Sequence, residues 1–565
     1  MTTVTTRTRK LLLWASLLIG AVAIGATILL RPSPYTGQFQ EGRADISLPD
    51  ALIRSSSLSR LPPDLLRIPL ARDVLTEDFV AYYEENENRV ALAGALRRIA
   101  YEHELDFPEK LLESVFDEPA EVALWRDDGG RLKDFVVVLS RNTLARVIQA
   151  LLPVAAKATD IQLSLVGKLD GTDVDILALQ YGSGHTLLLL TQGERIVVLS
   201  SPGMLLGAGD EPQSEKAVAI IKELLTDDKA LSPFARHFLL EKPLAAQTHE
   251  LTLAARAFAL DYQAFVPGLK ALNLSFDHQG KWQSAVLLDG AAWNIGDGSS
   301  LWSALPHGPG FCAVLPMNWP LLDSVRGTLN AEPEEATAQT APQATALQAS
   351  AAAPAVFTGP AAVCWYKGSR LYAPLFAGRL SARASTKERQ DFFALAAQAT
   401  KAGQGEIAEQ STPEKPAAAR DFALWQGKIA SPYGWPDENG TRYLTPALAI
   451  GDDLVFFSPN AALVSSALDV AAKRYPALTD SFGNREQAPL AFIDPAAAAA
   501  ILRDEIFISL PVSEEAIFRN AADAYLIPRL EALARYPAQR IEVTEKVRQE
   551  GIAWYPLAWQ EKTAP

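Results

Sequence analysis

Two serines precede proline where an apolar run gives way to a helical pattern, at Ser201–Pro202 and Ser458–Pro459. A serine on a turn between strand and helix is a common place for a hydrolase nucleophile, which needs a histidine in reach as its base. That turn normally has glycine two residues before and after the serine, and neither site shows that motif. We therefore expect both serines to cap helices, because serine is a favoured N-cap and proline suits the first helical turn.

The histidines also argue against a serine–histidine site made twice. All six lie before residue 308: His103, His185, His237, His249, His278 and His307. "HELDF" and "HELTL" lack the second histidine that zinc proteases place on the same helix face, and no phosphate-binding glycine motif occurs. The sequence predicts a non-enzymatic protein with no cofactor and no metal site. The alternatives are a hydrolase that uses the histidine-bearing first half, and a glycan or small-molecule sensor in a cleft between the halves.

Two further groups of residues are candidates for a structural or binding role. Cys312 and Cys364, the two cysteines of the chain, lie in apolar runs and are either a disulfide or two small buried side chains. The segments "WYKGSRLYAP" and "SPYGWP" place aromatic residues beside glycine, proline and lysine. These residues form either an interaction surface or aromatic packing at loop ends. They are Trp365, Tyr366, Tyr433 and Trp435.

The N-terminus has the pattern of a membrane anchor. Residues 11–30 carry no charge, and a helix of this length spans the hydrocarbon core of a bilayer. Arg7, Arg9 and Lys10 precede the span, so we expect a cytoplasmic tail at 1–10 and the remaining chain on the other side. A cleaved signal peptide is the alternative, although its apolar region is usually shorter. The net charge of −14 argues against a nucleic-acid partner.

The rest of the chain divides by composition. Residues 31–50 are polar and predict a stalk. Residues 329–358 contain too few large apolar groups to offset the conformational entropy lost on folding, which predicts a flexible insertion. A second polar stretch at 401–420 predicts a long loop. We expect a first domain at 51–300, and a second at 301–565 that contains the insertion and the loop.

Four weak internal matches, in the same order along both halves, indicate that the second domain repeats the first. They pair Pro202 with Pro459, "AFVPGLKAL" with "YLIPRLEAL", Trp293 with Trp554, and Trp125 with Trp365. Within each half, β-rich runs follow one another through short turns before a helical pattern begins, as at 131–141 and 173–201. The expected fold class is α+β: an N-terminal transmembrane helix followed by two duplicated α+β domains with mainly antiparallel sheets.

The segment "SSSLSRLPPDLLRIPLARDVLTEDFVAYYE" (55–84), followed by "LRRIAYEH" and "ALWRDDGG", resembles the YfaA-type family of uncharacterised, membrane-anchored envelope proteins of Gram-negative bacteria. The resemblance runs from the anchor to the C-terminus. It implies an inner-membrane protein with a periplasmic body. Because such proteins are often encoded beside an α2-macroglobulin-like protease trap, it also implies a scaffold or binding role with an envelope protein partner. The family defines no catalytic residues.

Overall fold

The computed structural model describes residues 45–561 with gaps, the longest of which are 75–117, 141–160, 320–356 and 382–421. The shorter gaps are 59, 128–131, 182–184, 207–212, 227–230, 259–261, 294–297, 437–440, 452, 482–488, 510–518 and 521. The expected anchor, most of the stalk, most of the insertion and the polar loop lie outside the described residues. Among the helices that are described, none is long and apolar enough to cross a membrane.

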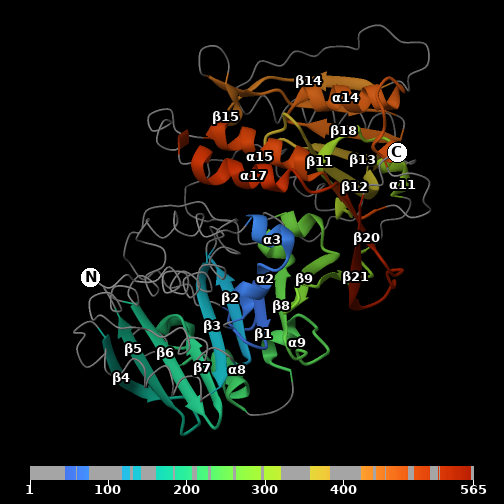
Figure 1. Cartoon of the computed structure of the whole chain (residues 1–565). Coiled ribbons are helices and arrows are strands. Elements are labelled where there is room, and N and C mark those ends of the chain that lie inside the picture. The colour runs from blue at the N-terminus through green and yellow to red at the C-terminus, as the bar shows by residue number, and fades with distance from the viewer. Residues whose placement is uncertain are drawn as a thin grey trace, which may run out of the picture. The chain divides into compact units, whose positions relative to one another are not determined.

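The described chain forms two compact units (Figure 1). The first unit extends to Leu260 and includes Lys270–Leu287, and the second contains Asp261–Leu269 and everything from Leu288 onward. The expected first domain ended at residue 300, whereas the described residues that follow Leu287 belong to the second unit. Both units consist mostly of antiparallel sheet with some helices, so the α+β class is confirmed.

The first unit is built on β1 (Ala51–Ser55), which pairs with β2 (Ala120–Arg126) on one side and β8 (Thr248–Ala254) on the other. Beyond β2 the order is β3, β7, β6, β5 and β4, and beyond β8 lie β9 and β10. These strands are β3 (Leu132–Ser140), β4 (Ile161–Lys168), β5 (Asp175–Tyr181), β6 (His185–Gln192), β7 (Arg195–Leu199), β9 (Leu269–Asp277) and β10 (Trp282–Asp289).

Apolar side chains fix which faces of this sheet are covered. Four consecutive buried leucines in β6, Leu187 to Leu190, show that both faces are covered there, since successive strand residues point to opposite sides. Leu61 of α2 (Leu61–Leu65) and Ile68, just before α3 (Pro69–Val74), lie in one apolar cluster with residues of β1 and β2. The remaining helical segments are η1 (Pro202–Met204), α8 (Glu215–Leu225), α9 (Pro233–His237) and α10 (Ala255–Phe258).

The second unit has the same strand order around its first strand. β11 (Pro309–Pro316) pairs with β12 (Phe357–Tyr366) and with β19 (Ala491–Ile493). Beyond β12 the order is β13, β18, β17 and β14, and beyond β19 lie β20 and β21. These strands are β13 (Leu375–Leu380), β14 (Ala423–Gln426), β17 (Ala447–Ile450), β18 (Leu454–Ser458), β20 (Gln539–Val543) and β21 (Ile552–Glu561).

Helices and a separate hairpin complete the second unit. Figure 1 shows α15 beside α17, and α15 packs on β11. The hairpin joins β15 (Ile429–Pro436) to β16 (Arg442–Leu444) and is not part of the main sheet. The helical segments are η2 (Tyr262–Phe265), α11 (Ser299–Trp302), α14 (Ala461–Ala471), η3 (Leu478–Ser481), α15 (Pro495–Ser509), η4 (Ala522–Leu526) and α17 (Ile527–Leu533).

Two of the four sequence matches occupy corresponding places in the two strand orders, and two do not. Trp125 and Trp365 lie in β2 and β12, and Pro202 and Pro459 come soon after β7 and β18. Residues 264–272 and 525–533 differ because the chain between β19 and β20 contains α15 and α17, whereas β8 and β9 are joined by short helical turns; Trp293 comes just after β10, whereas Trp554 lies within β21. Residues 525–533 are therefore helical, while residues 264–272 run into a strand.

Ser201 occupies the N-cap position of η1 with Pro202 in the first turn, as expected, whereas Ser458 does not cap α14. Ser201 precedes η1, but its side chain makes no cap bond; its hydroxyl donates to Asp134 at 3.0 Å instead. Ser458 ends β18 and accepts a hydrogen bond from the Asn460 N–H, and Asn460 is the residue that caps α14. Asparagine is as good an N-cap as serine, so the sequence pattern fits either starting point.

The C-terminal boundary of the expected insertion falls inside a strand. β12 begins at Phe357, inside the range 329–358, because Phe357 packs with Leu380 and Trp425 in a buried cluster. A large apolar residue at the end of a polar stretch marks where the strand resumes.

Candidate functional site

The predicted aromatic segments meet at one place in the second unit. Tyr433 is 42% exposed, and its ring lies 4.9 Å from that of Tyr372, which is 50% exposed. Leu371 is 42% exposed beside Tyr372, and Trp435 is half-buried on the same strand as Tyr433. We call Leu371, Tyr372, Tyr433 and Trp435 the aromatic surface.

Two predicted members do not belong to the aromatic surface. Tyr366 is buried, its hydroxyl donates to the Pro306 carbonyl at 3.1 Å, and burial raises the pKa of its phenol well above the ordinary value. It was wrongly predicted as a surface residue because it alternates with Trp365 along β12 and points into the core. Trp365 is half-buried against Phe311, and its indole N–H donates to the Leu371 carbonyl at 2.9 Å.

A buried ion pair holds the base of the aromatic surface. The Arg370 guanidinium donates from Nε and Nη2 to the two carboxylate oxygens of Glu505, at 2.8 and 2.7 Å. Glu505 also accepts from the Leu371 N–H at 3.0 Å, and Arg370 Nη1 donates to the Gly434 carbonyl at 2.7 Å. One network thus joins the β12–β13 turn, α15 and the hairpin. Such bidentate, charge-assisted bonds fix geometry as well as supply energy.

Gly434 lets the hairpin present its aromatic residues. β15 is irregular between Ala430 and Trp435, which both pair with Tyr443. A Cβ on Gly434 would overlap the Tyr443 backbone, so only glycine allows this approach. Tyr433 lies among the residues of β15 between these two pairings and is exposed.

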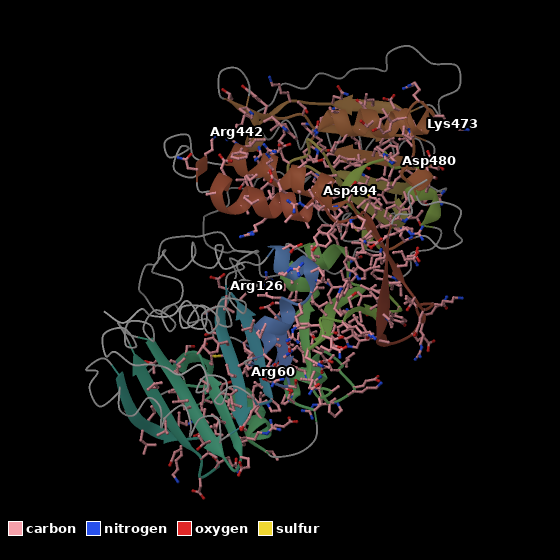
Figure 2. The ribbon with its side chains drawn as sticks, viewed as in Figure 1. Arg60, Arg126, Arg442, Lys473, Asp480 and Asp494 are labelled. Carbon is pink, nitrogen blue, oxygen red and sulfur yellow. A yellow bond between two sulfur atoms is a disulfide. The ribbon has the colours of Figure 1, made fainter. Side chains whose placement is uncertain are left out.

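A small hollow lies next to the aromatic surface. Its volume is about 180 Å³. The residues that line it come from the β12–β13 turn, the hairpin and the C-terminal part of α15: Gly368, Ser369, Trp435, Asp504, Phe507 and Ile508. Arg442 of β16, labelled in Figure 2, donates to the Ile508 carbonyl and fastens the hairpin to this end of α15.

The first unit contains a hydrogen-bonded chain of serine, histidine and aspartate that the sequence analysis missed. His249 Nδ1 lies 2.8 Å from Ser55 Oγ, and His249 Nε2 lies 3.1 Å from Asp64 Oδ2. The neutral tautomer that donates to Asp64 accepts the serine proton, as in a catalytic triad. β1 and β8 bring Ser55 opposite His249, although the two residues are 194 positions apart, so sequence spacing gives no signal.

Burial closes this chain of residues to solvent. Ser55 and His249 are 1% exposed and Asp64 is 3% exposed. Asp64 lies on α2, which also covers β1, so moving α2 to admit a substrate would remove the acid from the histidine. Burial lowers the pKa of His249, and the neighbouring Asp64 carboxylate opposes this shift. The geometry favours a neutral, structural histidine.

The two cysteines lie directly opposite each other on β11 and β12. Both are fully buried, and their sulfurs form a disulfide with a Cα–Cα distance of 4.0 Å. Among the described residues no group of histidine, cysteine and acidic side chains is placed to hold a metal ion.

Comparison with known proteins gives the family. A family model described as "Uncharacterized protein conserved in bacteria (DUF2138)" matches residues 11–559. The chain belongs to this family. It is 30% identical over 535 residues to the "Uncharacterized protein YfaA" of Escherichia coli (strain K12), which covers 91% of this chain and 90% of that protein. The YfaA-type resemblance is thus confirmed. No solved structure matches the chain.

Proposed function

We propose that this protein is a non-enzymatic binding or scaffold component of the bacterial envelope, which binds another protein through the aromatic surface. The observation that carries this is the exposure of Tyr372 and Tyr433 on a base made rigid by the Arg370–Glu505 pair. Rigid, exposed aromatic side chains are characteristic of protein interfaces, where they lose little conformational entropy on binding.

Site-specific crosslinking in the native envelope tests this proposal. A photoreactive phenylalanine at position 372 is expected to capture a discrete partner. The matched control is position 475, because Tyr475 is 45% exposed in the same unit but is not part of the aromatic surface. Equal capture at both positions, or none at 372, would contradict the proposal. An α2-macroglobulin-like protein is the partner to look for first.

The location is part of the same proposal. Residues 11–30 anchor the chain in the inner membrane with the body in the periplasm, as their length and the preceding basic residues suggest. A phosphatase that is active only in the periplasm, fused after residue 50, is expected to be active. Activity only of a reporter that requires the cytoplasm would refute this orientation.

We also propose that the two units arose by duplication of one domain. The support is their common strand order, with β1 and β11 each paired to the next strand along the chain and to a much later one. An independently determined structure of each unit would test this; different strand orders would reject it.

A hydrolase remains the second candidate, and the Ser55–His249–Asp64 chain is the observation in its favour. A serine nucleophile would be labelled by a fluorophosphonate probe, which loses fluoride as the serine oxygen attacks phosphorus. Labelling that disappears in Ser55→Ala and persists in Ser57→Ala would establish it. We expect no labelling in either variant or in the wild type, because Ser55 is closed to solvent.

A further inference from the structure

We propose that the hollow beside the aromatic surface receives an arginine side chain of the partner protein. This inference rests on the proposed function and adds the chemistry of the partner. The hollow, at about 180 Å³, is smaller than the pockets that hold drug-sized ligands and suits one large side chain. Trp435 belongs to both the hollow and the aromatic surface. A partner segment that binds the aromatic surface would therefore also lie next to the hollow.

The charge in the hollow favours a cation. Asp504 is the charged residue among those that line it, is exposed, and makes no ion pair within the described part of the chain. The carboxylate of the next residue, Glu505, already accepts hydrogen bonds from Arg370 and from the Leu371 N–H. A carboxylate left unpaired beside apolar groups is well placed to bind a cationic side chain.

The rings in the hollow suit a guanidinium in particular. Trp435 and Phe507 line it, and cations bind over aromatic faces, with tryptophan the strongest. Phe507 already has the Arg519 guanidinium 4.9 Å from its ring centroid. A planar guanidinium can stack on a ring while donating two hydrogen bonds to a carboxylate, which an ammonium group cannot do.

The described end of α15 already attracts a guanidinium. Asp504, Phe507 and Ile508 lie in its last described turns, up to Ser509. Arg442 donates to the Ile508 carbonyl at this same end. Neither Arg442 nor Arg519 lines the hollow, so the space itself is left for a third guanidinium. The chain's net charge of −14 also attracts a basic partner.

Calorimetric titration of the purified protein with two synthetic peptides tests the inference. The first is acetyl-Gly-Tyr-Arg-Leu-Gly-amide, and the second has citrulline, the uncharged analogue, in place of arginine. We expect the arginine peptide to bind about tenfold more tightly, as one charge-assisted bidentate contact predicts. The preference should fall as salt is added. Equal affinity for the two peptides, or no binding of the arginine peptide, would overturn the inference.

Two variants assign the effect to the hollow. Asp504→Asn should abolish the preference for arginine over citrulline. Arg503→Gln, which changes the neighbouring exposed charge outside the hollow, should retain it. A preference that survives Asp504→Asn would overturn the assignment.

The two proposals can fail separately. If crosslinking from position 372 captures a partner but Asp504→Asn leaves both the capture and the peptide preference unchanged, only the arginine site is wrong. If position 372 captures no more than position 475, the proposed interaction surface itself is wrong.

Discussion

At the scale of single residues, a buried ion pair organises the base of the aromatic surface. The Arg370 and Glu505 side chains are 3% and 9% exposed, and each would be strongly destabilising without the other. A pair of apolar residues could pack here at less cost in desolvation. The bidentate geometry instead specifies how the β12–β13 turn, α15 and the hairpin meet.

Arg370→Met is expected to lower the free energy of unfolding by about 3–5 kcal/mol, because Glu505 then remains buried without its partner. Urea unfolding of the purified protein measures this change. The control is Arg474→Met, which breaks the exposed pair with Asp469 and should cost less than about 1 kcal/mol. Equal effects of the two variants would show that the buried pair has no special role.

Gly434→Ala should displace the hairpin, since the new Cβ has no room against the Tyr443 backbone. We expect a loss of stability and a loss of crosslinking from position 372. Gly203→Ala is the control, because a Cβ there meets nothing within 4 Å. If Gly434→Ala behaved like Gly203→Ala, the close approach would be unimportant.

At the scale of elements, sequence patterns were a good guide to strands and helices and a poor guide to the contacts between them. The β-rich run at 131–141 contains β3, and the run at 173–201 contains β5, β6 and β7. The exact start of α14 was missed because Asn460 and Ser458 both suit a helix start. Local sequence patterns determine where strands and helices form, but two nearby residues that both favour a helix start leave the exact boundary open.

The candidate sites depend on contacts between distant segments, and sequence patterns indicated them only in part. Tyr433 and Trp435 were identified from their aromatic context, but the Arg370–Glu505 pair joins residues 135 positions apart. No spacing rule connects such positions. The Ser55–His249–Asp64 chain was missed for the same reason, since strand register alone brings it together.

The attachment of α2 to the sheet should depend on pH. Burial lowers the folded-state pKa of His249 below that of the unfolded chain, so its contribution to stability is present above about pH 6.5 and is lost as the pH falls below this. Hydrogen exchange in α2 is expected to be faster at pH 5.5 than at pH 7.5. A rate that does not change with pH, after correction for intrinsic exchange, would contradict this.

Two variants show which histidine causes the pH dependence of hydrogen exchange in α2. His237 in the same unit also has a pKa lowered by burial, so it adds to the same trend. His249→Gln should remove the pH dependence seen in α2, whereas His237→Gln should leave it in place. The opposite result would assign the effect to α9.

At the scale of the whole molecule, the two units share one strand order but differ in the contacts that their central strands make. When Trp125 of β2 is matched with Trp365 of β12, the positions of Cys312 and Cys364 correspond to Ala51 and Leu124. These two residues also lie opposite each other on neighbouring strands. In the first unit, Ser55 of the central strand β1 is instead hydrogen-bonded to His249 of β8, and His249 is hydrogen-bonded to Asp64 of α2. Common topology with different central chemistry is expected when selection acts on shape first.

The disulfide should stabilise the second unit and not the first. It joins residues separated by 52 positions, and loop-closure entropy gives a contribution of about 4 kcal/mol. The double variant Cys312→Ala, Cys364→Ala is therefore expected to unfold its second unit at lower urea, with the first unit unchanged. Reductant should destabilise the wild type and have no effect on the double variant. If reductant left the urea unfolding of the wild type unchanged, the bond would be excluded.

The same bond has a consequence for proteolysis. Residues 329–358, rich in Ala, Pro, Thr and Gln, lie between the two cysteines. A protease that cuts there breaks the polypeptide but leaves the two fragments covalently joined through β11 and β12. The nicked protein should migrate as one species on a gel without reductant and as two fragments with it. Cleavage between the cysteines would therefore not release the C-terminal part of the molecule, including the aromatic surface, from the N-terminal part of the chain.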